Sequence, residues 1–305
     1  MGRLSSKHRP MTLRATAAAG LLAVVSACSA GGGGGPGPAP QAETRAFPVT
    51  ADINQQRDDY SKRIVSIQLT NTSDAVLTVL EARLGSAQFA GRISWQAPPG
   101  GIQLPPGQTK SLPAPLPAPV CAAAGPADAA PTVTLKMAPA TGSGPEETIN
   151  AADPFGVLAR NNAELCLAQA AASIAEIRLD PGLEVSADGR TAVVRLLITP
   201  RAAGPAGEAA SLTIVRVEGT TLLAEDPAVP WPGGVAVRAG GDVREVRLGI
   251  RPARCDPHAV AEDKVGTLLP LRVTAAGRDG LLKVDAGPLL RGRIYDFATA
   301  ACGPQ

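Results

Sequence analysis

Three scarce residues recur in the same order in both halves of this chain. They are Trp95, Cys121 and Cys166 in the first half and Trp231, Cys255 and Cys302 in the second. The distance from the tryptophan to the last cysteine is 71 residues in both halves. The Trp-to-Cys and Cys-to-Cys gaps are 26 and 45 residues in the first half and 24 and 47 in the second. This repeated spacing predicts two copies of one domain.

The core of each copy must be aliphatic, since the whole chain holds only four Phe, two Trp and two Tyr. Val, Ile and Leu occur in short runs between glycines and prolines, which favours strands over long helices. In the first half, residues 63–70 alternate apolar and polar side chains, and a turn at 71–74 leads into a second strand at 75–82, a pattern typical of a hairpin. Further strands are predicted at residues 101–104, 131–137, 191–198, 210–217, 243–250 and 269–273.

In strand pattern, residues 46–305 resemble a pair of immunoglobulin-like or fibronectin-like β-sandwich domains. The landmark order departs from that of antibody-type domains, because each tryptophan precedes both cysteines instead of lying between them. The resemblance implies an all-β fold of two tandem immunoglobulin-like β-sandwich domains. We place these domains at residues 46–172 and 173–305.

The N-terminal segment resembles the signal peptide and lipobox of bacterial lipoproteins. Its basic residues are Arg3, Lys7, Arg9 and Arg14. They precede an apolar run at 15–27, too short to span a bilayer, that ends in the sequence Val-Ser-Ala before Cys28. The resemblance implies a signal peptide at 1–27, lipid attachment to Cys28, and anchoring to the outer face of the cytoplasmic membrane. Met1 and Met11 each provide a start that leaves this signal intact.

Residues 28–45 form a predicted flexible tether, because they are rich in glycine and proline and cannot build a packed core. A Gly-rich coil of this length typically spans roughly 20 to 25 Å. The tether would therefore lift the folded domains off the lipid headgroups. This layout is similar to that of the uncharacterised actinobacterial lipoproteins, a resemblance that implies no particular activity.

Four cysteines remain besides Cys28, and four cysteines in an exported chain allow three disulfide pairings. The duplication selects Cys121–Cys166 and Cys255–Cys302, because each copy then closes a loop of its own. Metal binding by these cysteines is the alternative. An oxidising compartment and the absence of a Cys-x-x-Cys motif disfavour it.

The net charge and the histidine content argue against several classes of protein function. Without residues 1–27 the chain carries 25 Lys and Arg against 27 Asp and Glu, so it lacks the basic surface that nucleic-acid binding requires. His258 is the only histidine after residue 27, whereas nucleophile activation and zinc chemistry usually need one or more well-placed imidazoles. Common hydrolase, metalloprotease and nucleotide-binding motifs are also missing from the sequence. We therefore expect no enzyme, no cofactor and no nucleic-acid partner.

Polar side chains cluster in the segment that follows Cys255. If Asp256 caps a short helix, His258 and Glu262 lie four residues apart on one face with Asp263 beside them. These four residues could hold a divalent ion or the basic group of a ligand. The alternative is a capped turn at the surface, in which Glu262 or Asp263 pairs with Arg254 or Lys264.

Two functional hypotheses follow. The first is a membrane-anchored extracytoplasmic lipoprotein that acts as a non-catalytic binding or structural module of the cell envelope, with another envelope protein as its partner. The second is an accessory protein that binds a metal ion or small ligand through Asp256, His258, Glu262 and Asp263. Neither hypothesis defines an oligomeric state.

Overall fold

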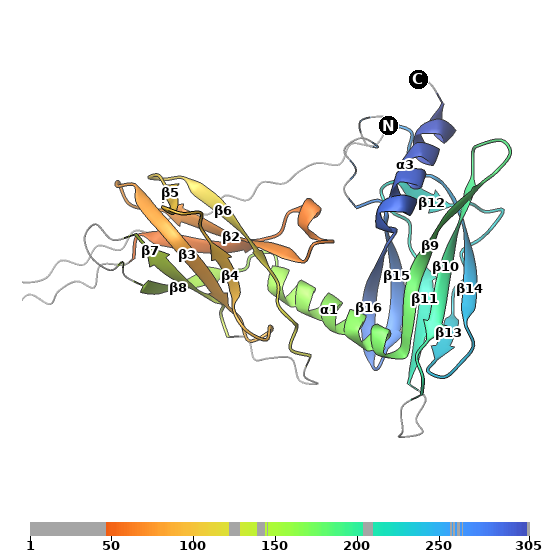
Figure 1. Ribbon diagram of the computed structural model, residues 1–305, viewed down its shortest axis with the longest axis horizontal. Coiled ribbons are helices and arrows are strands. Elements are labelled where there is room, and N and C mark those ends of the chain that lie inside the picture. The colour runs from red at the N-terminus through yellow and green to blue at the C-terminus, as the bar shows by residue number, and fades with distance from the viewer. Residues whose placement is uncertain are drawn as a thin grey trace, which may run out of the picture. The chain divides into compact units, whose positions relative to one another are not determined.

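The described part of the chain begins just after the predicted tether. The computed structural model describes residues 47–121, 129–138, 144, 146–203, 210–256, 258, 260, 263 and 265–303. The predicted signal peptide, Cys28 and the tether lie outside these residues. Residues 46–305 form one compact unit, and their architecture is mostly β, as the sequence predicted (Figure 1).

The strands of the first half follow one another without a long helix. They are β1 (Val49–Asn54), β2 (Ile64–Asn71), β3 (Leu77–Gly85), β4 (Ile93–Gln96), β5 (Ile102–Leu104), β6 (Thr109–Pro115), β7 (Thr132–Met137) and β8 (Glu146–Ala152), with a 3-10 helix η1 at Arg57–Asp59. β2 lies between β1 and β6, and β3 pairs with β4, β5 and β7. β8 joins both groups, because it runs antiparallel to β7 and then parallel to β1 at Ala151 and Ala152.

The second half contains two four-stranded sheets. Its strands are β9 (Ala175–Val185), β10 (Ala192–Pro200), β11 (Ser211–Val217), β12 (Leu223–Glu225), β13 (Val235–Arg238), β14 (Arg244–Pro252), β15 (Leu268–Ala275) and β16 (Arg278–Asp285). One sheet has the order β12-β14-β10-β9 and the other β13-β11-β15-β16. Each sheet directs its buried aliphatic residues into a shared core.

The strand pairing repeats between the halves. The order β1-β2-β6 corresponds to β9-β10-β14, and β5-β3-β7-β8 corresponds to β13-β11-β15-β16. Even an irregularity recurs, since the register of β3 on β7 shifts between Val79 and Glu81 and that of β11 on β15 shifts between Ile214 and Arg216. The main difference lies in β4, which pairs with β3, whereas β12 pairs with β14. The repeat predicted from three scarce residues is therefore present in the topology.

The predicted hairpin at residues 63–82 is wrong in its pairing, although both strands exist. β2 pairs with β1 and β6, whereas β3 pairs with β4, β5 and β7. The side chain of Asn71, which is fully buried, donates to the carbonyls of Ala75 and Leu104 at 2.7 and 2.8 Å. These bonds satisfy the backbone where the chain leaves the β1-β2-β6 group for the β3 group. A turn sequence alone does not distinguish such a crossing from a hairpin.

Two long helices in the described chain were not predicted. They are α1 (Val157–Ile174) and α3 (Gly287–Cys302), and each carries the last cysteine of its half. Helix α1 is rich in alanine and other good helix formers, and α3 has Pro288 in its first turn and Gly303 directly after its end, which are standard signals. The predicted domain boundary at 172/173 falls in the last turn of α1, and β9 follows this helix directly at Ala175.

Helix α1 packs against both hydrophobic cores. Val157 and Leu158, in its first turn, belong to the core of the first half. Leu167, Ala171 and Ile174, further along the helix, belong to the core of the second half. The helix therefore links the halves through buried side chains and not only through the chain itself.

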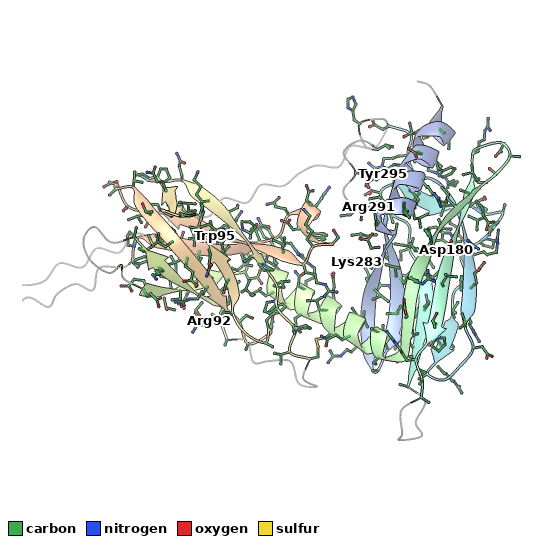
Figure 2. All side chains as sticks on the ribbon, in the orientation of Figure 1. Arg92, Trp95, Asp180, Lys283, Arg291 and Tyr295 are labelled. Atoms are coloured by element: carbon green, nitrogen blue, oxygen red, sulfur yellow. A yellow bond between two sulfur atoms is a disulfide. The ribbon has the colours of Figure 1, made fainter. Side chains whose placement is uncertain are left out.

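Each tryptophan packs against the core of its own half. Trp95 lies on β4 (Figure 2) and packs, partly buried, against the first core. Trp231 packs against the second core and donates its indole N–H to the carbonyl of Gly249 at 2.6 Å. Both large rings thus add apolar surface to cores that are otherwise aliphatic.

Both predicted disulfides are confirmed. Cys121, in the segment after β6, bonds to Cys166 of α1, and Cys255, after β14, bonds to Cys302 of α3. Their sequence separations are 45 and 47 residues. Each disulfide therefore joins the last helix of its half to the segment that follows β6 or β14, two strands earlier in the chain. Among the described residues no helix has both the length and the hydropathy to cross a bilayer.

We expect Asp153→Ala to lower the free energy of unfolding by about 0.5–2 kcal/mol. The carboxylate of Asp153 accepts the backbone N–H groups of Val157 and Leu158 at 2.7 and 2.9 Å, and Gly156 has no side chain to replace it. Urea titration of the variant measures the loss, with the exposed Glu147→Ala as a control for removing one negative charge. Equal stability of Asp153→Ala and Glu147→Ala would contradict this capping role.

Candidate functional site

Two cavities meet at Tyr60, Leu268 and Lys283, all of which line both. The first, called the helix cavity here, has a volume of about 210 Å³ and is also lined by Glu164 of α1. The second, called the loop cavity, has a volume of about 450 Å³ and is also lined by residues 219–221. The larger volume falls within the range typical of small-molecule sites.

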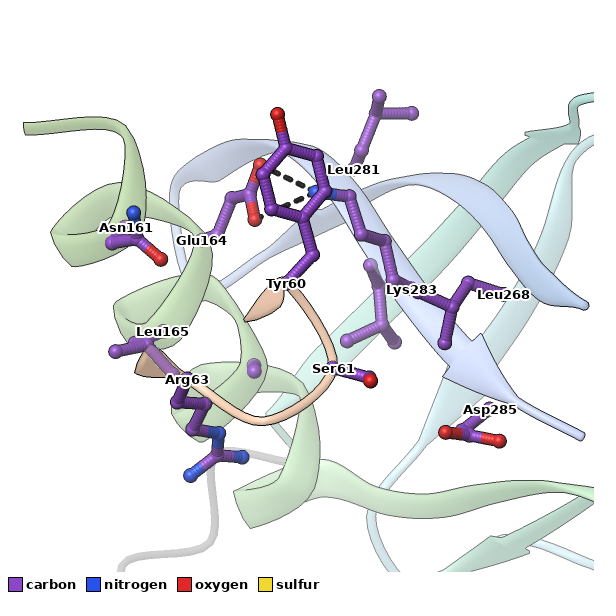
Figure 3. A pocket seen from close by; sticks show the side chains of 12 residues that line it. Tyr60, Ser61, Arg63, Asn161, Glu164, Leu165, Leu268, Leu281, Lys283 and Asp285 are labelled. Atoms are coloured by element: carbon purple, nitrogen blue, oxygen red, sulfur yellow. Dashed lines mark hydrogen bonds and ion pairs between the residues drawn. The ribbon is translucent and has the colours of Figure 1, made fainter. Parts of the chain in front are cut away.

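The residues that line the cavities near their shared boundary come from distant parts of the sequence. Tyr60 follows helix η1, Glu164 lies on α1, and Lys283 lies on β16 (Figure 3). Helix α1 packs along β16, so these side chains converge although more than 200 residues separate the first from the last. No local motif connects them. Sequence analysis therefore missed all three, and only the scarcity of tyrosine could have drawn attention to Tyr60.

Glu164 and Lys283 form an ion pair between the first helix and the last strand. Both carboxylate oxygens of Glu164 accept from Lys283 Nζ at 2.9 Å (Figure 3). The side chains are 32% and 31% exposed, so solvent screens the pair and its contribution to stability is small. The same Nζ lies 5.3 Å from the centroid of the Tyr60 ring, a cation–π distance. The ammonium group is thereby held at one place on the boundary between the cavities.

A second cation contacts the ring of Tyr60. The guanidinium of Arg160 lies 5.5 Å from the ring centroid and donates to Gln55 Oε1 at 2.9 Å. Gln55 and Asn161, both buried, exchange amide hydrogen bonds at 2.9 and 3.3 Å. Buried polar groups of this kind stay ordered because leaving them unpaired is costly. The network therefore fixes Arg160, and with it the position of Tyr60.

The turn that carries Tyr60 ends in a strained residue. Arg63 has φ of 54°, a left-handed conformation that is uncommon for a long side chain. Its carbonyl accepts the N–H of Leu116 at 2.9 Å, which holds this conformation at the start of β2. Arg63 also lines the helix cavity.

The walls of the loop cavity are fastened to one another. Thr220 Oγ1 donates to the carbonyl of Gly266 at 2.7 Å, and Thr221 Oγ1 donates to Asp263 Oδ1 at 2.5 Å. Arg254 lines the same cavity and directly precedes the disulfide-bonded Cys255. The loop cavity is therefore bounded by segments whose backbones are held in place.

The structure describes three of the four residues of the predicted Asp256 site. Asp256 and His258 are exposed, and the backbone N–H of His258 donates to Asp256 Oδ1 at 3.0 Å. Glu262 lies outside the described residues, so its predicted place beside His258 stays a prediction. Asp263 accepts hydrogen bonds from Thr221 Oγ1, the Gly266 backbone N–H and Tyr295 Oη, and in the described part of the chain no ion pair joins it to Arg254. Nor do the described residues contain three His, Cys, Asp or Glu side chains grouped to hold a metal.

The predicted segment nevertheless adjoins the loop cavity, because Arg254 and Val265, which flank it, both line that cavity. The polar segment predicted around Asp256 therefore lies next to the loop cavity, whose other lining residues come from distant parts of the chain. Asp263 accepts hydrogen bonds from Thr221 and from Tyr295 of α3, and it thereby joins the 219–221 segment to that helix.

The phenol of Tyr295 has a shifted pKa. Burial of the Tyr295 side chain and its hydrogen bond to Asp263 raise the pKa of Tyr295 to about 12. Both Tyr295 and Lys283 are labelled in Figure 2.

This pKa predicts a pH dependence. The folded chain keeps the Tyr295 proton up to a pH of about 12, whereas the unfolded chain releases it near the ordinary value of 10.0. The stability that this proton provides is therefore complete below pH 10 and is lost as the pH rises from 10 to about 12. Unfolding free energies measured across that interval should fall less steeply for Tyr295→Phe than for the unsubstituted chain.

Ultraviolet absorbance provides a direct check. The chain has only two tyrosines, so Tyr60→Phe leaves Tyr295 as the sole phenol. Its ionisation midpoint should lie at about 12. A midpoint at the ordinary value of 10.0 would show that Asp263 and burial do not hold the proton.

Comparison with known proteins adds little. No protein-family model matches the chain, and no curated protein matches it. Among solved structures, the YadV chaperone is similar at 11% identity and a TM-score of 0.21, covering 78% of this chain and 100% of the other. The exo-chitosanase CsxA of Amycolatopsis orientalis is similar at 12% identity and a TM-score of 0.20, covering 78% of this chain but only 26% of the enzyme. TM-scores this low support no inference about function.

Proposed function

We propose that this chain is an exported lipoprotein, cleaved before Cys28 and anchored by lipid to the outer face of the cytoplasmic membrane. Its two immunoglobulin-like or fibronectin-like halves serve there as a non-catalytic binding or structural module of the cell envelope. The observation that carries the proposal is the pair of disulfides, one in each half. Structural disulfides form and persist in oxidising environments outside the cytoplasm.

The cavities favour binding over catalysis. Glu164 and Lys283 neutralise one another, and Tyr60 is held beside two cations that have their own partners. His258 is exposed, and only its backbone N–H makes a described hydrogen bond. A general base or nucleophile requires a side chain within reach of a partner that activates it. The carboxylate of Asp263 already accepts three hydrogen bonds, which disfavours a metal at Asp256 and Asp263.

Fractionation of cells that express the full chain tests the anchor. The unsubstituted chain should take up a labelled fatty acid and sediment with membranes, because acyl chains on Cys28 would hold it there. Cys28→Ser should lose the label and the mature N-terminus, whereas Gly33→Ala in the tether should behave like the unsubstituted chain. A labelled or normally processed Cys28→Ser chain would overturn the lipoprotein assignment.

In-cell cross-linking tests the binding role. The anchored chain should capture the same envelope protein reproducibly, and Cys28→Ser should reduce that capture because it removes the chain from the membrane surface. Mass spectrometry of the purified complexes identifies the partner. If the anchored chain captures no envelope protein more than the unanchored one does, a protein-binding module is the wrong description.

A further inference from the structure

The loop cavity has an unbalanced charge. Its charged lining residues are Arg254 and Lys283, and none of the described residues that line it is a carboxylate. The remaining walls are formed by Tyr60, by apolar residues that include Leu268 and Pro270, and by the 219–221 segment. A cavity with an apolar floor and a few convergent polar groups is the usual form of a small-molecule site.

Lys283 is neutralised by a residue outside this cavity, whereas no described residue that lines the cavity balances the charge of Arg254. Lys283 pairs with Glu164, which lines the helix cavity on the other side of the boundary. Arg254 has no ion-pair partner in the part of the chain that the structure describes. Asp263, the carboxylate bonded to the Thr221 wall, accepts from three donors and is not a lining residue. The cavity therefore offers the positive charge of Arg254 to whatever enters it.

The position of Arg254 is defined by its neighbours in the chain. Ala253 donates its backbone N–H to the carbonyl of Leu222 at 2.9 Å, and Cys255 is bonded to Cys302 of α3. The 219–221 segment is tied to Gly266 by Thr220. Because these contacts hold the backbone of both segments, binding would require little further ordering of the chain, which favours affinity.

We propose that the loop cavity binds a soluble organic anion, with a carboxylate or phosphate group at Arg254 and an apolar body against Tyr60 and Leu268. A guanidinium matches the planar oxygen pair of a carboxylate or phosphate. The inference deepens the proposed binding function by naming a ligand class. It requires no covalent step.

The test uses the full chain in nanodiscs of phosphatidylcholine, whose headgroups carry no net charge, with empty nanodiscs as the blank. The probes are 4-phenylbutyrate, phenyl phosphate and the uncharged 4-phenylbutanamide, each titrated with the chain by ligand-observed NMR. At least one anion should bind, and the amide should bind about ten-fold more weakly or worse, because it lacks the charge.

Variants locate the binding. Arg254→Gln should weaken anion binding by about five-fold or more, and Arg254→Lys should restore part of the loss. Arg238→Gln, an exposed arginine on β13 that does not line the cavity, should leave the affinity unchanged. Because Arg254 is exposed, its replacement should not affect folding, and thermal unfolding of each variant verifies this.

Three results would overturn the inference. They are no binding of either anion, equal binding of the amide, and unchanged binding by Arg254→Gln. A chain that is lipidated and captures its envelope partner but shows one of these results refutes only the anion site. A chain that binds the anion but is neither lipidated nor membrane-bound refutes the proposed location instead.

Discussion

Replacing Cys255 and Cys302 together with alanine should lower the free energy of unfolding by about 4 kcal/mol. The bond closes a loop across 47 residues, and in the chain-entropy model a loop of that length greatly restricts the unfolded chain. The expected loss is a large fraction of the stability of an ordinary domain, so helix α3 should detach from β14 at a lower temperature or denaturant concentration. Urea or thermal unfolding of the full chain measures the change.

Two controls separate this effect from the loss of the side chains. Reduction of the unsubstituted chain should destabilise it further, because the Cys121–Cys166 bond would open as well. Peptide mapping without reductant should recover Cys121 joined to Cys166 and Cys255 joined to Cys302. A double variant as stable as the unsubstituted chain, or a map that joins Cys121 to Cys255, would contradict the pairing.

Leu290→Ala should lower the free energy of unfolding by about 2–5 kcal/mol. Leu290 lies on α3, is fully buried, and belongs to the core of the second half. Removing its side chain leaves a cavity that the surrounding residues fill only in part. The adjacent Leu289 is 67% exposed, so Leu289→Ala should change stability by less than about 0.5 kcal/mol.

This matched pair tests the packing of a helix that the sequence analysis did not predict. Both variants remove the same atoms from neighbouring positions, so helix propensity and composition cancel in the comparison. Chemical denaturation of both, with circular dichroism as the probe, gives the difference directly. Similar losses at both positions would mean that α3 does not present Leu290 to the core.

The repeat and the disulfides were predictable because both follow from the order and spacing of scarce residues along the chain. Duplication keeps the spacing of scarce residues, so the Trp and Cys landmarks of one half identify those of the other. With two copies, the pairing that closes each copy on itself becomes the simplest of the three, and it is the one observed. The pattern of apolar residues likewise located eight of the sixteen strands in the described chain.

The helices were missed for a physical reason. A surface helix usually shows one apolar stripe, because it packs on one core. In α1 the first turn packs on one core and the positions from Leu167 to Ile174 pack on another, so no single stripe develops. In α3 the helix propensity of its residues and Pro288 in its first turn are signals that the sequence analysis did not use.

The sequence by itself determined the all-β class, the two-fold repeat, the disulfide pairs and the polar segment around Asp256, because each depends on residues near one another or on a repeated spacing. Only the tertiary structure decided which strands pair across the 71–74 turn and that Asp263 bonds to Tyr295. It alone brought Tyr60, Glu164 and Lys283 together. Their meeting depends on how α1 packs along β16, a long-range contact set by the burial of whole faces that leaves no local pattern in the chain.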